Sequence, residues 1–380
     1  MKYILVLNSG SETLKCRVFE RKKLDEKFNI LVERIGLKKS FLTYYINNRR
    51  NQVNFSSGIK DHKQALKEVI KILPDEIYKN LEIIGHRIVH GGEDFVKPTL
   101  LNKQIISKLE VYNKFSPIHN PINIKCIKAA ISHFPRLKHI AVFDTLYFKD
   151  LAEHIYLYSI PFKYYEYEGI RKYGFHGLSH EYMYQQACLK LNKRNLNVIS
   201  CHLGSGASIT AVVQGKVLDT TMGLTPLAGL TMSTRSGDLD PSIPLYLIKN
   251  LKMEVSEVDN ELNFNSGLKG LYGTSDLREV LIAGGQRIPG FKVNKKYSKH
   301  KKELAKLVIK MYLYNIQRYV ASYAGLLGKV DALIFSGGVG ERNQYIRNEI
   351  INNVNFIIKP KVLIVKANEE LVIAGKCKNY

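Results

Sequence analysis

The sequence predicts an α/β protein of two or three domains, and three observations lead to this expectation. The chain has 380 residues, of which 45% are hydrophobic, so it can bury a sizeable core. Strand-like apolar runs alternate with amphipathic segments in its first half. A pattern of strand, glycine turn and return strand occurs near the N-terminus and again after residue 195.

The first half of the chain supplies the alternation. Each strand-like run is short and apolar, and two segments between the runs have apolar residues at helical spacing. The expected strands are 3–8, 16–20, 28–36, 83–90 and 139–144, and the expected helices lie near 61–73 and 121–133. Because strands that alternate with helices build layered sheets, this half is predicted to form one α/β domain.

The second half repeats part of this plan. The stretch "LNVISCHLGSGASITAVVQGKVLD" at 196–219 predicts a strand, a glycine turn and a strand, like the opening of the chain. An internal duplication facing a shared cleft is one interpretation, and coincidence is the other, since such units are common. The stretch "KVDALIFSGGVGER" at 329–342 predicts a buried strand, a glycine-rich turn and a helix that begins near Asn343. In that geometry, backbone amides and a helix dipole can meet a nucleotide phosphate.

Composition argues against several classes of protein. The longest apolar runs have strand length, far below the roughly 20 residues of a membrane helix, and no signal peptide is recognisable. Five isolated cysteines without a CxxC pair favour neither a disulfide framework nor a zinc site. These features predict a cytoplasmic protein with no membrane partner.

The net charge of +23, from 57 Lys and Arg against 34 Asp and Glu, raises nucleic acid as a partner. The lysines are scattered among acidic and apolar residues, and we find no recognition-helix, RNA-binding or zinc-finger pattern. A solvated lysine-rich surface is therefore the preferred interpretation, and no nucleic-acid partner is expected. Such a surface would still attract anionic substrates and raise their encounter rate.

The stretch "NSGSETLK" at 8–15 follows the first apolar run and allows two interpretations. Glycine with serine and asparagine makes an ordinary tight turn between two strands. Alternatively, Gly10 lets backbone amides approach a phosphate oxygen, while Ser11, Thr13 and Lys15 add donors. The stretch lacks the glycine spacing and the following helix of a Walker motif. On these residues alone the choice stays open.

Seven further motifs combine residue types that suit anion chemistry, and each also has a purely structural explanation. Arginine forks bind carboxylates and phosphates but also form structural ion pairs. Loop histidines, and acidic residues at strand ends or helix starts, serve catalysis in some proteins and capping or dipole compensation in others. The motifs are "GHRIVHGGE" with Arg87, "SPIHNP" with His119, "VFDT" with Asp144, "YGFHGLSH" with Phe175 and His176, "TMSTRSGDLDP" with Arg235, "SGLKGLYGTSDLRE" with Asp276 and Arg278, and "NEEL" at 368–371.

Together these motifs resemble those of the acetate kinase family, within the superfamily of acetate and sugar kinases, heat-shock proteins and actin. The resemblance runs from Asn8 to Glu370, nearly the whole chain, and the motifs follow in the family's order. It also includes "HLGSGAS" at 202–208 and "SGGVGE" at 336–341. It implies that the stretch at 8–15 is a phosphate hairpin rather than a plain turn.

The resemblance implies a fold of two duplicated actin-like, ribonuclease H-like α/β domains with an active-site cleft between them. Residues 1–146 and 371–380 would form the N-terminal domain, and residues 147–370 would form the domain that binds nucleotide and makes a homodimer. The implied reaction is ATP + acetate ⇌ ADP + acetyl phosphate, by direct in-line transfer with Mg²⁺, for which Mn²⁺ can substitute.

The resemblance also assigns chemical roles. Acetate is already ionised at pH 7, so it needs alignment and relief from charge repulsion rather than a general base. Two arginines are suited to clamp acetate and the phosphoryl group in flight, and a histidine can donate toward the phosphoryl oxygens. The implied catalytic residues are Arg87, Asp144, His176 and Arg235, and the implied magnesium residues are Asn8 and Glu369.

The acetyl pocket is expected to be small and apolar. One extra methylene is worth only about 1–3 kcal/mol in such a pocket, so propionate would be a slower substrate and butyrate a poor one. The implied substrate residues are Arg87, Val89, Ile118, His119, Phe175 and Pro226. The implied nucleotide residues are Ser11, Thr13, Lys15, His202, Leu203, Gly204, Ser205, Gly206, Asp276, Leu277, Arg278, Gly338, Val339, Gly340, Glu341 and Arg342.

The chain departs from the family pattern at a few positions. Ser205 and Arg342 stand where the family usually has Asn, and Glu12 stands where it has Ser. Glu12 is expected to point away from the phosphates, because side chains alternate along a hairpin. Leu178 and Ala228 replace residues that are usually polar. No implied catalytic or magnesium residue is lost, so activity is expected.

Two alternatives remain on the sequence alone. One is a propionate kinase or another short-chain carboxylate kinase. The other is a non-catalytic actin-like or nucleic-acid-binding protein that uses the +23 surface, which retention of the arginines, the histidine and the acidic residues disfavours. The sequence does not encode the physiological direction of the reaction.

Overall fold

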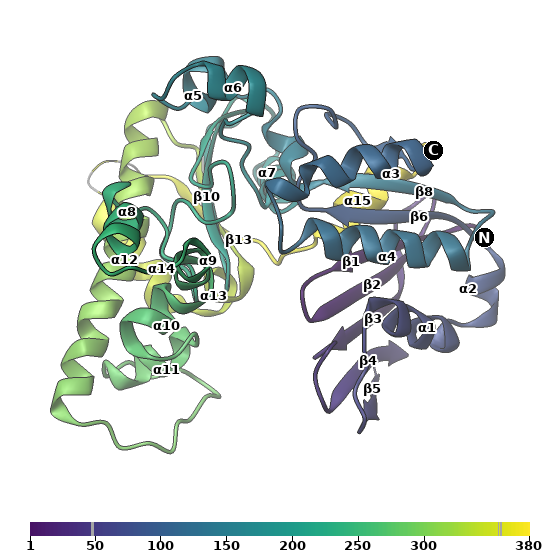
Figure 1. Cartoon of the computed structure of the whole chain (residues 1–380), viewed down its shortest axis with the longest axis horizontal. Helices are drawn as coiled ribbons and strands as arrows, with labels where there is room; N and C mark the ends of the chain where they lie inside the picture. Colours follow the sequence, from purple (N-terminus) through teal and green to yellow (C-terminus); the bar gives the residue numbers. More distant parts are fainter. Residues whose placement is uncertain (47–48, 356, 358) are drawn as a thin grey trace. The chain divides into compact units, whose positions relative to one another are not determined.

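The computed structural model describes residues 1–46, 49–355, 357 and 359–380 of the chain. They form two compact units, one made of Met1–Lys149 with Asn368–Tyr380 and the other of Asp150–Ala367 (Figure 1). The sequence predicts boundaries after residues 146 and 370. Glu369 and Glu370 belong to the first unit, together with the N-terminal strands.

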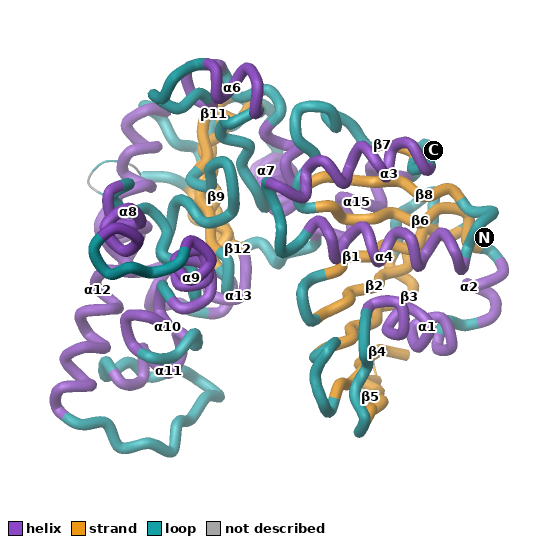
Figure 2. The backbone as a smooth tube through the Cα atoms, viewed as in Figure 1, coloured by secondary structure: helices purple, strands orange, loops and turns teal. Residues whose placement is uncertain are grey.

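The first unit is built on a mixed sheet with the strand order β5-β4-β3-β2-β1-β6-β8-β7 (Figure 2). The strands are β1 Tyr3–Ser9, β2 Thr13–Glu20, β3 Glu26–Glu33, β4 Ser40–Ile46, β5 Arg49–Phe55, β6 Leu81–Ile88, β7 Thr99–Leu100 and β8 Lys138–Phe143. Strands β1 to β5 pair antiparallel in succession, whereas β6 is parallel to β1 and β8 is parallel to β6. All of β1 is buried, which explains why its sequence is apolar from Tyr3 to Leu7.

Helices cover both faces of this sheet. The helical segments are α1 His62–Ile72, α2 Asp75–Lys79, α3 Lys103–Glu110, η1 Val111–Lys114, α4 Asn120–His133, η2 Asp144–Phe148 and α15 Glu369–Cys377. Successive side chains of β1 point to opposite faces. Leu5 and Leu7 therefore pack in the core with Cys126 of α4, whereas Val6 and Asn8 face α15.

The second unit repeats this arrangement, with the strand order β11-β10-β9-β12-β13. Its strands are β9 Val198–Leu203, β10 Ala207–Val213, β11 Lys216–Thr220, β12 Ala332–Ser336 and β13 Lys361–Ile364. Strand β9 pairs antiparallel with β10 and parallel with β12, as β1 does with β2 and β6. Each unit thus contains an antiparallel three-strand meander continued by two parallel strands. Of the two interpretations of the sequence, the internal duplication is confirmed.

Helices also pack on both faces of the second sheet. They are α5 Glu153–Tyr156, α6 Lys163–Glu168, α7 Gly177–Leu191, α8 Ser242–Lys249, α9 Val255–Asn260, the π-helical η3 Glu261–Asn265, α10 Gly267–Tyr272, α11 Leu277–Ala283, α12 Lys299–Leu327, α13 Gly337–Arg342 and α14 Gln344–Val354. The alternation along β9 turns Ser200 and His202 toward α7, and Cys201 toward Tyr312 of α12. None of the described helices combines the length and the hydrophobicity of a membrane span.

Three local predictions differ from the structure. Residues 337–342, expected as a glycine-rich turn, form the short helix α13, because Gly337 makes the turn by itself with a φ of +78°. Helix α7 begins at Gly177, two residues before Ser179, which the motif "YGFHGLSH" predicts as the helix start, because His176 has a left-handed φ of 57° and ends the preceding loop. The hairpin of β4 and β5 was not expected, since β5 is largely exposed and polar and shows no apolar alternation.

Candidate active site

In the first unit, Arg87 lies at the centre of a polar cluster at the carboxyl ends of β1, β6 and β8. Its Nε and Nη2 donate to the two carboxylate oxygens of Asp144 at 3.0 and 2.6 Å. Its Nη1 donates to Asn8 Oδ1 at 3.0 Å and lies 3.6 Å from Glu369 Oε2. The structure therefore brings four predicted residues together where α/β proteins bind ligands.

Burial and charge act in opposite directions on this cluster. Burial alone would lower the pKa of Arg87, but the Asp144 and Glu369 carboxylates more than compensate, and the pKa is raised. Burial raises the pKa of Asp144 above its ordinary value, and the Arg87 guanidinium opposes that rise. The charge on Asp144 thus depends on Arg87 staying in place.

Two members of the cluster are not singled out by the sequence motifs. Glu370, which is 3% exposed, accepts a hydrogen bond from Asn8 Nδ2 at 2.7 Å. Arg17 Nε lies 3.5 Å from Glu370 Oε2, and Arg17 Nη1 donates to Asn368 Oδ1 at 2.9 Å. Strand alternation is a signal that could have found Arg17, because it lies two residues beyond Lys15 and so on the same face.

The residues of this cluster fit a magnesium ion that keeps its water. Among the described residues, no group of three or more His, Cys, Asp or Glu could hold a metal ion. Mg²⁺ does not need such a group, because it usually binds through one or two carboxylates and the substrate phosphates. Arg87 engages both oxygens of Asp144, whereas Glu369 Oε2 has longer contacts, 3.6 Å to Arg87 Nη1 and 3.4 Å to Asn8 Nδ2. Glu369 is therefore the better placed carboxylate.

The predicted phosphate hairpin turns between Gly10 and Thr13. Gly10 N–H donates to the Thr13 carbonyl oxygen at 2.9 Å, and the Gly10 carbonyl oxygen accepts from His62 Nε2 at 2.8 Å. A Cβ at Gly10 would lie 2.7 Å from Thr13 Oγ1, so a larger residue there would displace the Thr13 hydroxyl. Ser11 and Glu12 lie in the turn and not in a strand. Strand alternation therefore does not decide where Glu12 points; its side chain is exposed, and its orientation away from the phosphates stays a prediction.

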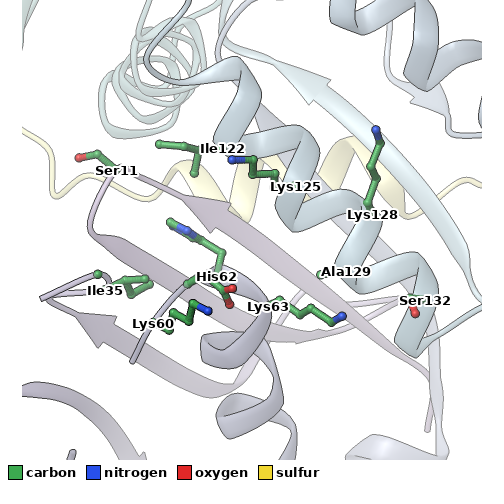
Figure 3. A pocket seen from close by; sticks show the side chains of 12 residues that line it. Ser11, Ile35, Lys60, His62, Lys63, Ile122, Lys125, Lys128, Ala129 and Ser132 are labelled. Atoms are coloured by element: carbon green, nitrogen blue, oxygen red, sulfur yellow. The ribbon is translucent and has the colours of Figure 1, made fainter. Parts of the chain in front are cut away.

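A hollow of about 480 Å³ lies beside this hairpin, between α1 and α4 (Figure 3). Ser11 is at one edge of it, and Lys60, Lys63 and Lys125 contribute to its lining. Lys15 does not line the hollow, since it pairs with Asn8 across β1 and β2 and faces the Arg87 cluster. The predicted phosphate-side residues of the hairpin therefore lie in two different surroundings.

The predicted substrate residues of the first unit lie after β6 and at the start of α4. Val89 is buried, and its N–H donates to Asn123 Oδ1 at 3.2 Å. Asn123 Nδ2 in turn donates to the Ser9 carbonyl oxygen at 2.9 Å. Ile118 and His119 are half-buried, and His119 is the residue that precedes α4. Asn123 thus joins the segment after β6 to the end of β1, a connection that the motifs do not indicate.

In the second unit, His176 and Arg235 flank the loop that follows β9. A Cβ at Gly206 would lie 3.3 Å from His176 Nε2 and 3.7 Å from Arg235 Nη1. The ring of His202 lies 4.4 Å from that of His176, centroid to centroid. Arg235 Nη1 donates to the Pro226 carbonyl oxygen at 3.3 Å, and burial lowers the pKa of Arg235. The guanidinium remains charged at neutral pH, because its ordinary pKa exceeds 12.

A pocket of about 490 Å³ lies where the loop after β9 meets α13 and the start of α11. The predicted nucleotide residues that line it are Gly204, Ser205, Asp276, Leu277, Arg278, Gly338, Val339 and Arg342. Lining residues that were not predicted are Ser233, Leu268, Ser275, Ile288, Tyr312 and Asn343. Predicted residues outside the lining are His202, Leu203, Gly206, Gly340 and Glu341.

Two of the predicted nucleotide residues have structural tasks as well. Asp276 caps α11 by accepting from the Arg278 N–H at 2.9 Å, and its carboxylate also binds the Arg278 guanidinium. Glu341 Oε1 accepts from the Gly337 N–H at 3.1 Å and so holds the turn after β12. Of the two predicted apolar substrate residues in this unit, Phe175 is 1% exposed and belongs to the core.

A duplicated sheet with glycine loops at its strand ends and an arginine cluster defines the class of the protein, a phosphotransferase with the actin-like fold. The model described as the Acetokinase family matches residues 3–361. The acetate kinase of Clostridium novyi is 38% identical, over 99% of this chain and 97% of that relative. The solved structure of a propionate kinase from Francisella tularensis is 36% identical with a TM-score of 0.90, over 100% of both chains. That of Porphyromonas gingivalis acetate kinase is 33% identical with a TM-score of 0.85, over 99% of this chain and 98% of that one.

The chain therefore belongs to the acetokinase family, and it is a phosphotransferase with a carboxyl group as acceptor.

Proposed function

We propose that the chain transfers the γ-phosphoryl group of ATP to acetate, reversibly, and produces ADP and acetyl phosphate. The match to the acetokinase family over residues 3–361 carries this proposal. Within that match, every residue that the resemblance assigns to charge neutralisation is retained. The Arg87 cluster and the His176–Arg235 group supply the chemistry that the reaction needs.

The reaction joins two anions, so the enzyme has to reduce their repulsion and align them. A carboxylate oxygen of acetate attacks the γ-phosphorus in line, and the bond from this phosphorus to the β–γ bridging oxygen breaks as ADP leaves. No general base is needed, because acetate is ionised at pH 7. We assign the buried Arg235 to neutralise the phosphoryl oxygens in the transition state and His176 to donate a hydrogen bond to them.

Arg87 has a more restricted role than a free clamp. Three of its five N–H groups donate to Asp144 and Asn8, so at most two can reach a substrate carboxylate. We assign Asp144 to hold the guanidinium in position. Bound Mg²⁺ would neutralise charge on the nucleotide phosphates, with Glu369 and Asn8 as the residues that hold or orient it. Mn²⁺ prefers the same oxygen donors and is proposed to substitute.

The nucleotide is assigned to the pocket of the second unit. Gly204 and Gly338 line it just beyond the buried strands β9 and β12, and the absence of side chains there lets phosphate oxygens approach the backbone. Arg342 places a cation in the lining where the family usually has Asn, and we expect it to strengthen contacts to phosphate. The hairpin residues Ser11, Thr13 and Lys15 are assigned to the phosphate side.

A propionate kinase is the second candidate, and the TM-score of 0.90 with the Francisella tularensis propionate kinase favours it. We assign Val89 and Ile118 of the first unit and Pro226 of the second to the acetyl group, and His119 to the carboxylate side, whereas Phe175 belongs to the core of its unit. Hydroxylamine trapping of the acyl phosphate, with acetate, propionate and butyrate in turn, separates the candidates. We expect acetate to have the highest kcat/KM, with propionate about 10- to 200-fold lower. If propionate had a higher kcat/KM than acetate, propionate kinase would become the preferred function. If no carboxylate gave an acyl phosphate, both candidates would be refuted.

We also propose that the protein is a homodimer formed through the second unit and located in the cytoplasm. Ile243, Leu245 and Tyr246 of α8 are 45%, 52% and 57% exposed, and Val255 of α9 is 69% exposed. Such a group of apolar side chains is typical of an interface. Sedimentation velocity should give a dimer for the wild type and a monomer for Leu245→Lys. The five cysteines are free, which favours a reducing compartment.

A further inference from the structure

A chain of hydrogen bonds leads from His176 into the interior of the second unit. His176 Nδ1 lies 2.9 Å from Ser208 Oγ, and the same hydroxyl lies 2.7 Å from His180 Nε2. His180 Nδ1 lies 2.8 Å from Ser200 Oγ, which donates to the Thr210 carbonyl oxygen at 3.3 Å. His180, Ser200 and Ser208 have no exposed surface. We refer to His176, Ser208, His180 and Ser200 as the His176 relay.

The fold places the relay on one face of the second sheet. Ser200 of β9 is paired with Thr210 of β10, and Ser208 of β10 is paired with His202 of β9. The side chains of these four strand residues therefore lie on the same face of the sheet, the face that α7 covers. Helix α7 begins directly after His176 and presents His180 one turn later. Sheet register and helix start together determine which atoms meet.

The far end of the relay determines the position of every proton in it. A carbonyl oxygen can only accept, so the Ser200 hydroxyl points to Thr210 and its oxygen accepts from His180 Nδ1–H. Burial lowers the pKa of His180 well below its ordinary value, which keeps the ring neutral with a lone pair on Nε2. That lone pair accepts from the Ser208 hydroxyl, whose oxygen is left to accept from His176 Nδ1–H.

We propose that the His176 relay holds the neutral His176 ring as its Nδ1–H tautomer, so that Nε2 can donate to a phosphoryl oxygen only when the ring is an imidazolium cation. The statement about the tautomer stands on the hydrogen bonds alone, and the statement about donation rests on the proposed function. His176 Nε2 lies toward Gly206, where a Cβ would be 3.3 Å away. Ser208, His180 and Ser200 are thereby positioning residues for His176.

The proposal predicts the direction of the pH dependence. The titratable or charged groups near His176 include His202 of β9, whose ring lies 4.4 Å away, His180 of α7, which binds the same Ser208 hydroxyl, and Arg235, which also lies beside Gly206. Arg235 disfavours a second cation, whereas a bound phosphoryl group favours the imidazolium. We therefore expect kcat to fall as the pH rises through the pKa of His176 in the substrate complex, since the fraction of imidazolium decreases.

Nuclear magnetic resonance of the full chain, labelled with ¹⁵N-histidine, tests the tautomer without any reference to activity. Protonated and bare ring nitrogens have separate chemical shifts, and a His176→Gln variant identifies the resonances. At a pH where His176 is neutral, we expect its proton on Nδ1. An Nε2–H tautomer in the wild type would overturn the proposal.

The Ser200→Ala variant tests the relay itself, because it removes the hydroxyl group at the far end of the relay, two hydrogen bonds away from Ser208, and changes no atom that binds His176. Without Ser200 Oγ as acceptor, His180 is free to carry its proton on Nε2 and donate it to Ser208. Ser208 would then donate to His176 Nδ1, and the His176 population should move toward Nε2–H. The matched control is Ser179→Ala, whose hydroxyl lies 2.8 Å from His202 Nδ1 and outside the relay. An unchanged tautomer in Ser200→Ala, or the same shift in Ser179→Ala, would contradict the relay.

Kinetics test the link to the reaction. The Ser208→Ala variant loses the hydroxyl oxygen that accepts from His176 Nδ1–H. This hydrogen bond is stronger when His176 is an imidazolium than when its ring is neutral, so its loss destabilises the cation more. The high-pH limb of its kcat profile should move to lower pH by about one unit, with little change in KM, and Ser208→Thr should restore it. A kcat that is reduced equally at every pH would indicate a merely structural role and refute the proposal. If no carboxylate is phosphorylated at all, the proposed function fails, while the tautomer measurement still decides the inference.

Discussion

Asp144 is the single residue on which the geometry of Arg87 depends most. Its two carboxylate oxygens accept from Nε and Nη2, on one edge of the guanidinium, at 3.0 and 2.6 Å, and Asp144 is 1% exposed. In Asp144→Asn the amide cannot accept on both sides, and Arg87 becomes a buried cation with less compensation. We expect the free energy of unfolding to fall by about 3 kcal/mol, measured by chemical denaturation, together with a large loss of kcat.

The matched control is an exposed ion pair on the same unit. Lys128 Nζ lies 2.7 Å from Glu110 Oε1, with side chains 57% and 44% exposed. Glu110→Gln should cost less than about 1 kcal/mol, because solvent screens the pair. If Glu110→Gln and Asp144→Asn lowered the free energy of unfolding equally, the buried ion pair would stabilise the fold no more than an exposed one.

Gly206 is the residue at which a single methyl group should affect the chemistry directly. A Cβ there would lie 3.3 Å from His176 Cε1 and Nε2, closer than an ordinary contact, so the imidazole must shift. We expect Gly206→Ala to lower kcat on the order of ten- to a hundred-fold, since small displacements of reacting groups are costly. Gly325→Ala in α12, where a Cβ has no neighbour within 4 Å, is the control and should add about 0.5–1 kcal/mol of stability with no change in kcat. If Gly206→Ala kept the full kcat, the position of the His176 ring would not matter for the reaction.

Motifs could identify the reactive residues but not their partners. Asn8, Arg87, Asp144 and Glu369 stand in long, peculiar motifs, and they meet in one cluster. Glu370 lies beside Glu369 in the motif "NEEL", but the sequence did not predict a role for it. Its role depends on which face of β1 meets α15, and that is a property of packing. The relay residues Ser200, Ser208 and His180 were missed for the same reason, because the register of β9 and β10 brings them together.

At the scale of elements, a buried histidine pair between β6 and β8 predicts how stability depends on pH. His139 Nε2 donates to the Phe134 carbonyl oxygen at 3.0 Å, so its Nδ1 accepts from His86 Nε2, also at 3.0 Å. Burial lowers the pKa of both rings, which stay neutral in the fold. Below pH of about 6.5 the unfolded chain binds protons that the folded chain does not. Stability is therefore lost as the pH falls below that value, by up to about 1.4 kcal/mol per pH unit for each ring.

His139→Gln tests this dependence, because glutamine offers one acceptor and one donor but does not titrate. Denaturation of the variant between pH 7.5 and 5, a range chosen around the ordinary histidine pKa, should show a shallower loss of stability than the wild type. The exposed His133 gives the control, since His133→Gln should keep the wild-type slope. Parallel slopes for all three proteins would mean that the buried pair does not couple folding to protons.

The strands that the sequence predicts and the short helices that it does not predict are stabilised in different ways. Central strands such as β1 and β12 are buried on both faces, and they are therefore apolar over the runs 3–7 and 332–335. The short helices α8 to α11 carry few buried residues each, and their place is set by the tertiary contacts of the second unit. Helices of six to eight residues have too few turns for a periodic signal, and local propensity alone would not hold them.

At the scale of the whole molecule, the net charge of +23 predicts how substrate capture responds to salt. A positive field accelerates the approach of anions, and the effect grows with the charge of the ligand. Raising the ionic strength from about 0.05 to 0.5 M shortens the Debye length from above 10 Å to a few ångströms. We expect kcat/KM for ATP to fall roughly tenfold over this range and that for the singly charged acetate about twofold, with kcat nearly constant. Steady-state kinetics in potassium chloride measures this, and sucrose at equal osmolality is the control. Equal salt dependence for both substrates would mean that the lysine-rich surface serves solubility and not capture, because only a long-range field distinguishes ligands by their charge.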